Sequence, residues 1–155
     1  MPSFGNRSKE NLVTAHEDLQ KVANEVIKYF DCTVTSGHRT PEEQFELFKK
    51  GRKESNGEWV IVNKREVVTH IDGYDKKSKH NEFPSKAIDL YPCPVSFNKD
   101  ERDRAVYFAG YFIATARQMY ERGEILQEIF SGMDWDGDNN LKEHSFVDIP
   151  HMQIK

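Results

Sequence analysis

The sequence lacks several features that would define a protein class at once. It has only two cysteines among 155 residues, Cys32 and Cys93, and their spacing fits neither a disulfide framework nor a zinc knuckle. No apolar run approaches the length of a membrane span, and the N-terminus has no apolar segment of the kind a secretory signal needs. We therefore expect a product made in the cytoplasm, with reduced cysteines and no stable membrane association.

An excess of positive charge is also missing. The chain has 22 Lys and Arg against 26 Asp and Glu, a formal net charge of −4, which gives no general attraction to nucleic acid. Hydrophobic residues make up 37% of the sequence, and charges of both signs are interspersed along it, as in a folded protein. We expect residues 1–155 to form a single domain, a monomer, with no nucleic-acid partner.

Three stretches, 14–30, 40–51 and 98–123, have the apolar spacing or the end signals of helices. In the first, Thr14 and Glu17 fit a capping box. The second begins with Thr-Pro and stops at a glycine, and the third begins at an asparagine and also ends at a glycine. The first is predicted to pack on the core, and the third is predicted to be the main core helix.

Alternating side chains predict short strands at 32–36, 87–91 and 151–154. Residues 59–62 and 66–70 are predicted to form a hairpin. Helices and short strands that follow no repeating order indicate an α+β fold, with an antiparallel or mixed sheet flanked by helices.

Two segments combine a histidine with a carboxylate. In SKHNEFPSKAIDLYP, a loop through Pro84 can bring His80 and Asp89 to one point. In DIPH, Asp148 and His151 flank an Ile-Pro pair that suits an extended chain. Two imidazoles and one carboxylate around an open position form the ligand set of a catalytic zinc, and the other carboxylate would be free to act as a base. Ordinary packing or surface histidines are the alternative.

The DWDGDNN segment is a second candidate for metal binding. Asp134, Asp136 and Asp138 alternate as calcium ligands do, which suggests a regulatory Ca²⁺ site. The sixth position of an EF-hand loop is glycine, however, and here it is Asn139. A solvated acidic turn is the alternative interpretation.

His144 and Arg39 are two further candidate site residues. His144 precedes His151 by seven residues and is a rival metal ligand. Arg39 lies on the turn before the second helix, a rigid place from which to present a guanidinium to a substrate carbonyl or carboxylate. A simple surface charge is the alternative for Arg39.

Taken in order, the motifs TSGHRTPEEQ, SKHNEFPSKAIDLYP, SGMDWDGD and FVDIPH resemble the motif set of the zinc D-alanyl-D-alanine carboxypeptidase family. They are most similar to its bacteriophage branch, the L-alanyl-D-glutamate peptidase endolysins. The resemblance runs from about Leu12 to Lys155. It implies a hedgehog/DD-peptidase-like fold with one Zn²⁺ per chain and no separate wall-binding module.

The resemblance also implies roles for single residues. The family's Ser-x-His…Ala-x-Asp element matches Ser78, His80, Ala87 and Asp89, so His80 and Asp89 would be zinc ligands. Eight residues separate this His and Asp, where many members have six, and we interpret the difference as a loop insertion. The acid-x-x-His element makes His151 the third ligand.

In the same element Asp148 would be the catalytic acid/base. The family's strand-to-helix turn matches Arg39, Glu43 and Gln44, which assigns substrate binding and oxyanion stabilisation to Arg39. The implied reaction is hydrolysis of the L-Ala–D-Glu bond of the peptidoglycan stem during phage lysis, after a holin-like partner opens the membrane. The alternatives are a D,D-carboxypeptidase or D,D-dipeptidase, and a hedgehog-like module that binds zinc without turnover.

Overall fold

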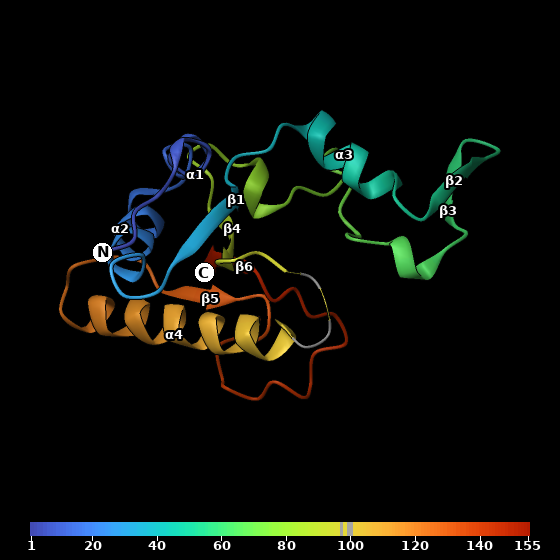
Figure 1. Cartoon of the computed structure of the whole chain (residues 1–155). Helices are drawn as coiled ribbons and strands as arrows, with labels where there is room; N and C mark the ends of the chain where they lie inside the picture. The colour runs from blue at the N-terminus through green and yellow to red at the C-terminus, as the bar shows by residue number, and fades with distance from the viewer. Residues whose placement is uncertain (97, 99–100) are drawn as a thin grey trace.

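Short strands with alternating side chains form one antiparallel sheet in the computed structural model, which describes residues 1–96, 98 and 101–155 (Figure 1). The order of the strands in the sheet is β1-β4-β6-β5. Their bounds are β1 (Cys32–Ser36), β4 (Ala87–Pro92), β5 (Ile129–Ser131) and β6 (His151–Ile154).

The two central strands separate the core from the functional face. Ile88 and Leu90 on β4 and Met152 on β6 are buried in the core. Because side chains alternate along a strand, Asp89 and His151 point to the opposite face. Asp89 and His151 are also direct partners in the register of β4 against β6. The strand pattern alone therefore brings one carboxylate and one imidazole together.

Three helices pack around this sheet (Figure 1). They are α1 (Asn6–Leu12), α2 (Glu17–Val26) and the long α4 (Arg102–Glu121). Leu19 and Val22 on α2, and Phe108 and Phe112 on α4, are at most 1% exposed and join the core of the sheet. Burial of each large apolar side chain contributes about 1.5–3 kcal/mol. We call the sheet and these three helices the body.

Residues 41–77 form an arm that extends away from the body (Figure 1). The arm contains α3 (Pro41–Lys49), the hairpin β2 (Arg52–Ser55) and β3 (Glu58–Ile61), and the short 3₁₀ turn η1 (Lys64–Glu66). Asn56 and Gly57 connect the two strands with φ angles of 52° and 81°. Positive φ at both central residues gives a turn whose twist matches a two-stranded ribbon.

The predicted helices are confirmed, with one correction at the start of α2. The capping box of Thr40 and Glu43 on α3 is present. Thr14 does not cap α2, because its hydroxyl donates to the Asn11 carbonyl and accepts from the His38 N–H, and His16 caps the helix instead. The start of α4 was predicted at Asn98. Residues 99 and 100 lie outside the described part of the chain.

The predicted strands at 32–36, 87–91 and 151–154 are confirmed. The predicted hairpin is wrong, because 58–61 pairs with the preceding residues 52–55 and not with 66–70. The α+β fold class is confirmed. Among the described residues, no helix has both the length and the apolar character of a membrane span.

Candidate metal centre

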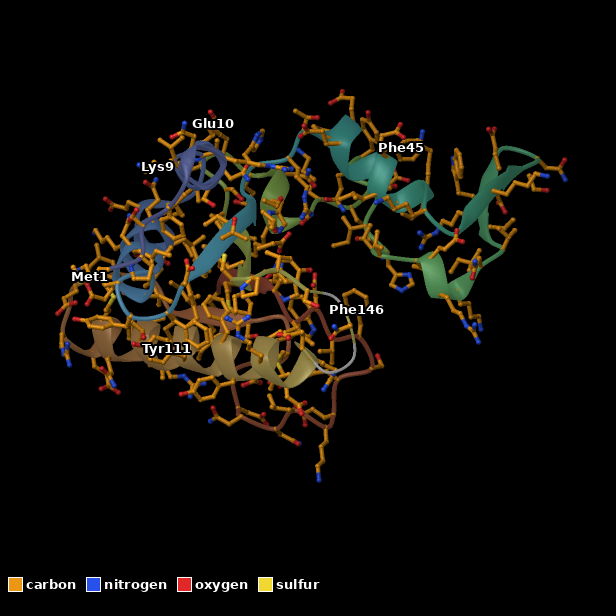
Figure 2. The ribbon with its side chains drawn as sticks, viewed as in Figure 1. Met1, Lys9, Glu10, Phe45, Tyr111 and Phe146 are labelled. Atoms are coloured by element: carbon orange, nitrogen blue, oxygen red, sulfur yellow. The ribbon has the colours of Figure 1, made fainter. Side chains whose placement is uncertain are left out.

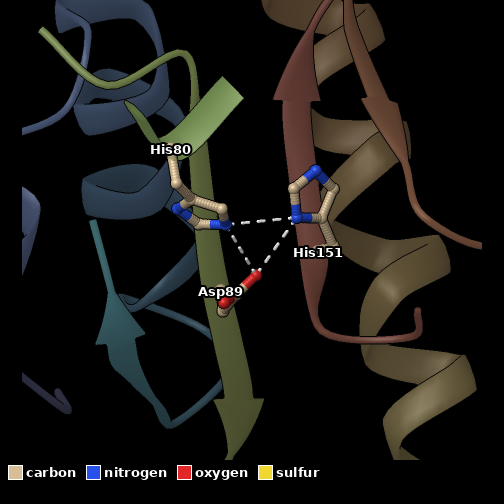
Figure 3. Close-up of side chains that lie close together, drawn as sticks. All are labelled: His80, Asp89 and His151. Carbon is tan, nitrogen blue, oxygen red and sulfur yellow. Dashed lines mark hydrogen bonds and ion pairs between the residues drawn. The ribbon is translucent and has the colours of Figure 1, made fainter. Parts of the chain in front are cut away.

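Three buried side chains meet at one point between the central strands and the 3₁₀ turn η2 (Lys79–Asn81) (Figure 3). His80 Nε2, His151 Nδ1 and Asp89 Oδ1 are each 3.2 Å from the other two. Ligands held 2.0–2.1 Å from a tetrahedral zinc ion lie about 3.3 Å from one another. The three atoms therefore have the separations of three ligands of one ion.

The hydrogen bonds on the outer side of each ring support the same interpretation. His80 Nδ1 donates to the Gly37 carbonyl at 2.7 Å, and His151 Nε2 donates to Gln153 Oε1 at 2.9 Å. The ring nitrogens that face Asp89 are then free of hydrogen in the neutral tautomers. Three acceptors at this distance repel one another unless a proton or a cation lies among them. The group can hold a metal ion.

Local sequence fixes the position of His80. The Ser78 hydroxyl accepts a hydrogen bond from the His80 N–H, and Asn81 Oδ1 accepts one from the Ser78 N–H, which together form a capping box around a single turn. The His80 carbonyl accepts from the Arg39 N–H at 2.8 Å. A Cβ atom at Gly37 would overlap the Asn11 carbonyl oxygen, so only glycine lets this turn approach closely enough to bind His80.

The other carboxylate oxygen of Asp89, Oδ2, pairs with the Arg39 guanidinium. Arg39 Nη2 lies 2.5 Å from Asp89 Oδ2, and its Nε donates to Ser36 Oγ at 2.9 Å. Burial works against the charge on Asp89, but His80, His151 and Arg39 hold its pKa well below its usual range. Asp89 is therefore a carboxylate with one oxygen for a metal and one for a guanidinium.

Asp148 lies beside the three buried residues and is clamped by Gly132. The Asp148 N–H donates to the Gly132 carbonyl at 2.8 Å, and the Gly132 N–H donates to the His151 carbonyl at 2.7 Å. A Cβ atom at Gly132 would overlap the Asp148 carbonyl. Burial, and then the negative charge of Asp89, raise the pKa of Asp148. A carboxyl group that binds a proton more readily than usual is suited to acid/base work.

These residues lie in a groove of about 520 Å³ that runs between the arm and the C-terminal loop. The arm contributes Gln44, Leu47 and Val67 among others, and the opposite side contributes Trp135 and Phe146. Phe146 is labelled in Figure 2, and its ring centroid lies 5.9 Å from that of His70, a residue of the arm. The volume is in the range of sites that enclose a small ligand or a short peptide segment.

The structure places the remaining candidates elsewhere. His144 is not part of the group of three, because it lies near Asp134 and Asp136 in the preceding loop. Asp134, Asp136 and Asp138 do not converge as one set, and both oxygens of Asp134 accept backbone N–H groups of its own turn. The calcium site stays a prediction without a common point for its three ligands.

Sequence reasoning did not identify three residues that support the site: Gly37, Gly132 and Gln153. Gln153 had a usable signal, because it lies two residues after His151 in a strand and so shares its face. The two glycines carry no such signal, since their importance depends on what approaches them from distant segments.

A comparison with solved structures supports the fold. The crystal structure of the L-Ala D-Glu endopeptidase ChiX from Serratia marcescens is similar to this chain with a TM-score of 0.59 and 19% sequence identity. The match covers 99% of this chain and 90% of that one. No protein-family profile and no curated protein matches the sequence. The chain therefore has the α+β fold of a solved endopeptidase at low sequence identity.

Proposed function

We propose that this chain is a zinc-dependent peptidoglycan hydrolase that cleaves the stem peptide between L-Ala and D-Glu. The observation that carries the proposal is the group of three acceptor atoms, each 3.2 Å from the others, at the base of a groove. The fold shared with an L-Ala D-Glu endopeptidase supports the choice of substrate.

In this proposal His80, Asp89 and His151 hold the zinc ion. When bound, zinc lowers the pKa of a coordinated water from 15.7 to about 7 and polarises a carbonyl group. Asp148 takes the proton of the attacking water on its carboxylate and passes it to the nitrogen of the leaving amine as the C–N bond breaks. Its raised pKa favours the first transfer, from the water to the carboxylate, and the Gly132 clamp holds it in reach of the reaction.

Arg39 has two tasks in the proposed reaction. Through Nη2 it orients Asp89, and its Nη1 reaches Gln44 Oε1 only at the long distance of 3.4 Å. Nη1 is thus the nitrogen that can turn to the oxyanion of the substrate. One well-placed donor of this kind is typically worth about 3 kcal/mol in the transition state.

The biological role that we propose is lysis of a host wall at the end of a phage cycle. The protein would accumulate in the host cytoplasm and reach the peptidoglycan through a separate holin-like pore. The resemblance of the ordered motifs to phage endolysins supports this role. A D,D-carboxypeptidase or D,D-dipeptidase with the same site is the rival within the fold.

Digestion of purified peptidoglycan tests the proposed bond. Incubation with the zinc-loaded protein should produce new N-terminal D-Glu, and a chelator should stop the reaction until zinc is added back. Release of free D-Ala or of the D-Ala-D-Ala dipeptide would transfer the activity to the rival. A loaded protein that produces neither would favour a module that binds zinc without turnover.

A further inference from the structure

We propose that three lysines on the arm side of the groove, Lys50, Lys77 and Lys79, select a substrate with a free carboxylate next to the scissile bond. We call them the lysine wall. The inference rests on the proposed function and adds a specificity determinant to it. All three residues line the same groove as the metal-binding group.

Most other charged side chains of the groove are paired with one another. Arg39 is paired with Asp89, and Asp89 also faces the two histidines. Asp148 is the remaining acidic residue among those that line the groove, and it lies on the opposite side. The groove therefore has an excess of positive charge on the wall that the arm provides.

The lysines of the wall have no partner within the part of the chain that the structure describes. No ion pair or side-chain hydrogen bond there involves Lys50, Lys77 or Lys79. Their neighbours differ, because Lys49 lies 2.5 Å from Glu46 and Lys86 lies 2.6 Å from Glu82. Three ammonium groups without a carboxylate partner beside a groove are suited to an anionic ligand.

The surrounding segment strengthens the local field. Between residues 49 and 79 there are nine Lys and Arg and five Asp and Glu, a net of +4, in a chain whose net charge is −4. The arm as a whole, residues 41–77, has eight Lys and Arg and eight Asp and Glu, so the excess lies in the part after α3 and in the adjoining turn, while α3 carries Glu42, Glu43 and Glu46. Like charges that line one groove repel one another, and a bound anion relieves that repulsion.

The proposed substrate supplies such an anion. A glutamyl residue has two carboxyl groups, and the next peptide bond can consume only one of them. The D-Glu that follows the scissile bond therefore keeps a free carboxylate unless it is amidated. The lysine wall would bind this group and so position the D-Glu side of the substrate toward the arm.

Binding measurements test this without relying on turnover. We would use the zinc-loaded Asp148→Asn protein and two synthetic stem peptides, one with a free D-Glu carboxylate and one with that carboxyl amidated. The free acid should bind about 5- to 30-fold more tightly, as expected for one or two ion pairs at a partly exposed site. The preference should shrink as NaCl rises from 50 to 500 mM.

A triple variant, Lys50→Gln with Lys77→Gln and Lys79→Gln, should bind both peptides equally. The matched control replaces Lys53, Lys64 and Lys76 with Gln, which removes the same charge from exposed positions of the same segment outside the groove. Zinc content and thermal midpoint should match the parent in both variants, because these side chains are not part of the core.

The outcomes separate the two proposals. Equal binding of both peptides by the parent protein, or a preference that survives in the triple variant, would overturn the lysine wall. So would a control that loses as much preference as the triple variant. If the preference is present but the wild-type protein hydrolyses neither peptide, the lysine wall stands and the peptidase assignment fails.

Discussion

The body and the arm differ in how they are stabilised. The body encloses a continuous core in which Leu19, Phe112, Ile88 and Met152 are fully buried. The arm, residues 41–77, all of which the structure describes, buries only Gln44, Gly51 and Gly73. Its aromatic residues contact one another at the surface, for example Phe45 and Trp59 at 5.7 Å.

This difference corresponds to a division of tasks. The candidate metal-binding group lies where atoms are held precisely, because the paired strands β4 and β6 of the body position Asp89 and His151 and the capped turn η2 positions His80. The arm contributes the wall of the groove and its positive charge. Segments with few buried contacts open and move at lower cost, which suits a surface that receives a large polymer.

The largest expected effect comes from removing His80, the proposed zinc ligand on the turn η2 beside the body. His80→Ala should lower zinc affinity more than about 100-fold and abolish hydrolysis, because loss even of a residue that supports a ligand costs 10- to 100-fold. The arm offers a matched control in His70→Ala, which should retain one zinc per chain. Elemental analysis and a competitive chelator titration measure both. A His80→Ala protein that keeps a full equivalent of zinc would contradict the ligand set.

Next in size is the loss of the acid/base. Asp148→Asn should reduce turnover by about 10²- to 10⁴-fold and leave zinc bound, because it removes proton transfer and not a ligand. Asp136→Asn, an exposed carboxylate of the neighbouring loop, is the control and should keep full activity. Rates on purified cell walls, measured together with metal content, test this prediction. Unchanged turnover in Asp148→Asn would remove this residue from the mechanism.

Stability measurements should separate the two regions. Phe112→Ala opens a cavity in the body and should lower the free energy of unfolding by about 3–5 kcal/mol. Trp59→Ala removes a partly exposed ring from the arm and should cost about 1 kcal/mol or less, with a raised KM as the main consequence. Denaturant titration and initial rates give both numbers. Equal destabilisation by the two variants would mean that the arm shares the core.

The smallest predicted effect is a dependence of body stability on pH. Burial raises the pKa of the Cys32 thiol to about 12, from 9.0 for a free thiol. The unfolded chain loses this proton first, so the contribution is complete below pH 9 and is lost as pH rises toward 12. At pH 10 the loss is about 1.4 kcal/mol.

Comparison with Cys32→Ala isolates this contribution from other groups that titrate at high pH. The difference in unfolding free energy between wild type and variant should shrink by about 1.4 kcal/mol from pH 8 to pH 10. A difference that stays constant over this range would show that the thiol is not shielded. The arm has no buried ionisable group with which to show such an effect.

The same contrast explains what could be predicted from the sequence. Within the body, strands β1, β4 and β6 are encoded locally by alternating side chains, and the end of α4 by Gly123. The motifs with His80, Asp89 and His151 therefore led to the residues that the fold brings together. Strand β5 was not predicted, because three residues in a loop-rich stretch carry too little pattern.

In the arm, local pattern was less reliable. The Asn-Gly turn at Asn56 and Gly57 is a strong hairpin signal and joins β2 to β3, whereas the predicted strand at 66–70 faces no core. The Thr14 cap, which was predicted for α2 of the body, failed for another reason. The Thr14 hydroxyl accepts from the His38 N–H, a contact made across 24 residues. Sequence pattern alone does not show which distant groups compete for the hydrogen bonds of a side chain.

One consequence of the pairing of Asp89 with His151 concerns the lifetime of the protein. The same two strands carry core residues on one side and the proposed ligands Asp89 and His151 on the other, so an ion bound by both residues would also resist separation of the strands. Each tenfold excess of free zinc over its dissociation constant adds about 1.4 kcal/mol against unfolding. Zinc supply in the surroundings would then govern how long each copy survives proteolysis, as well as how fast it works.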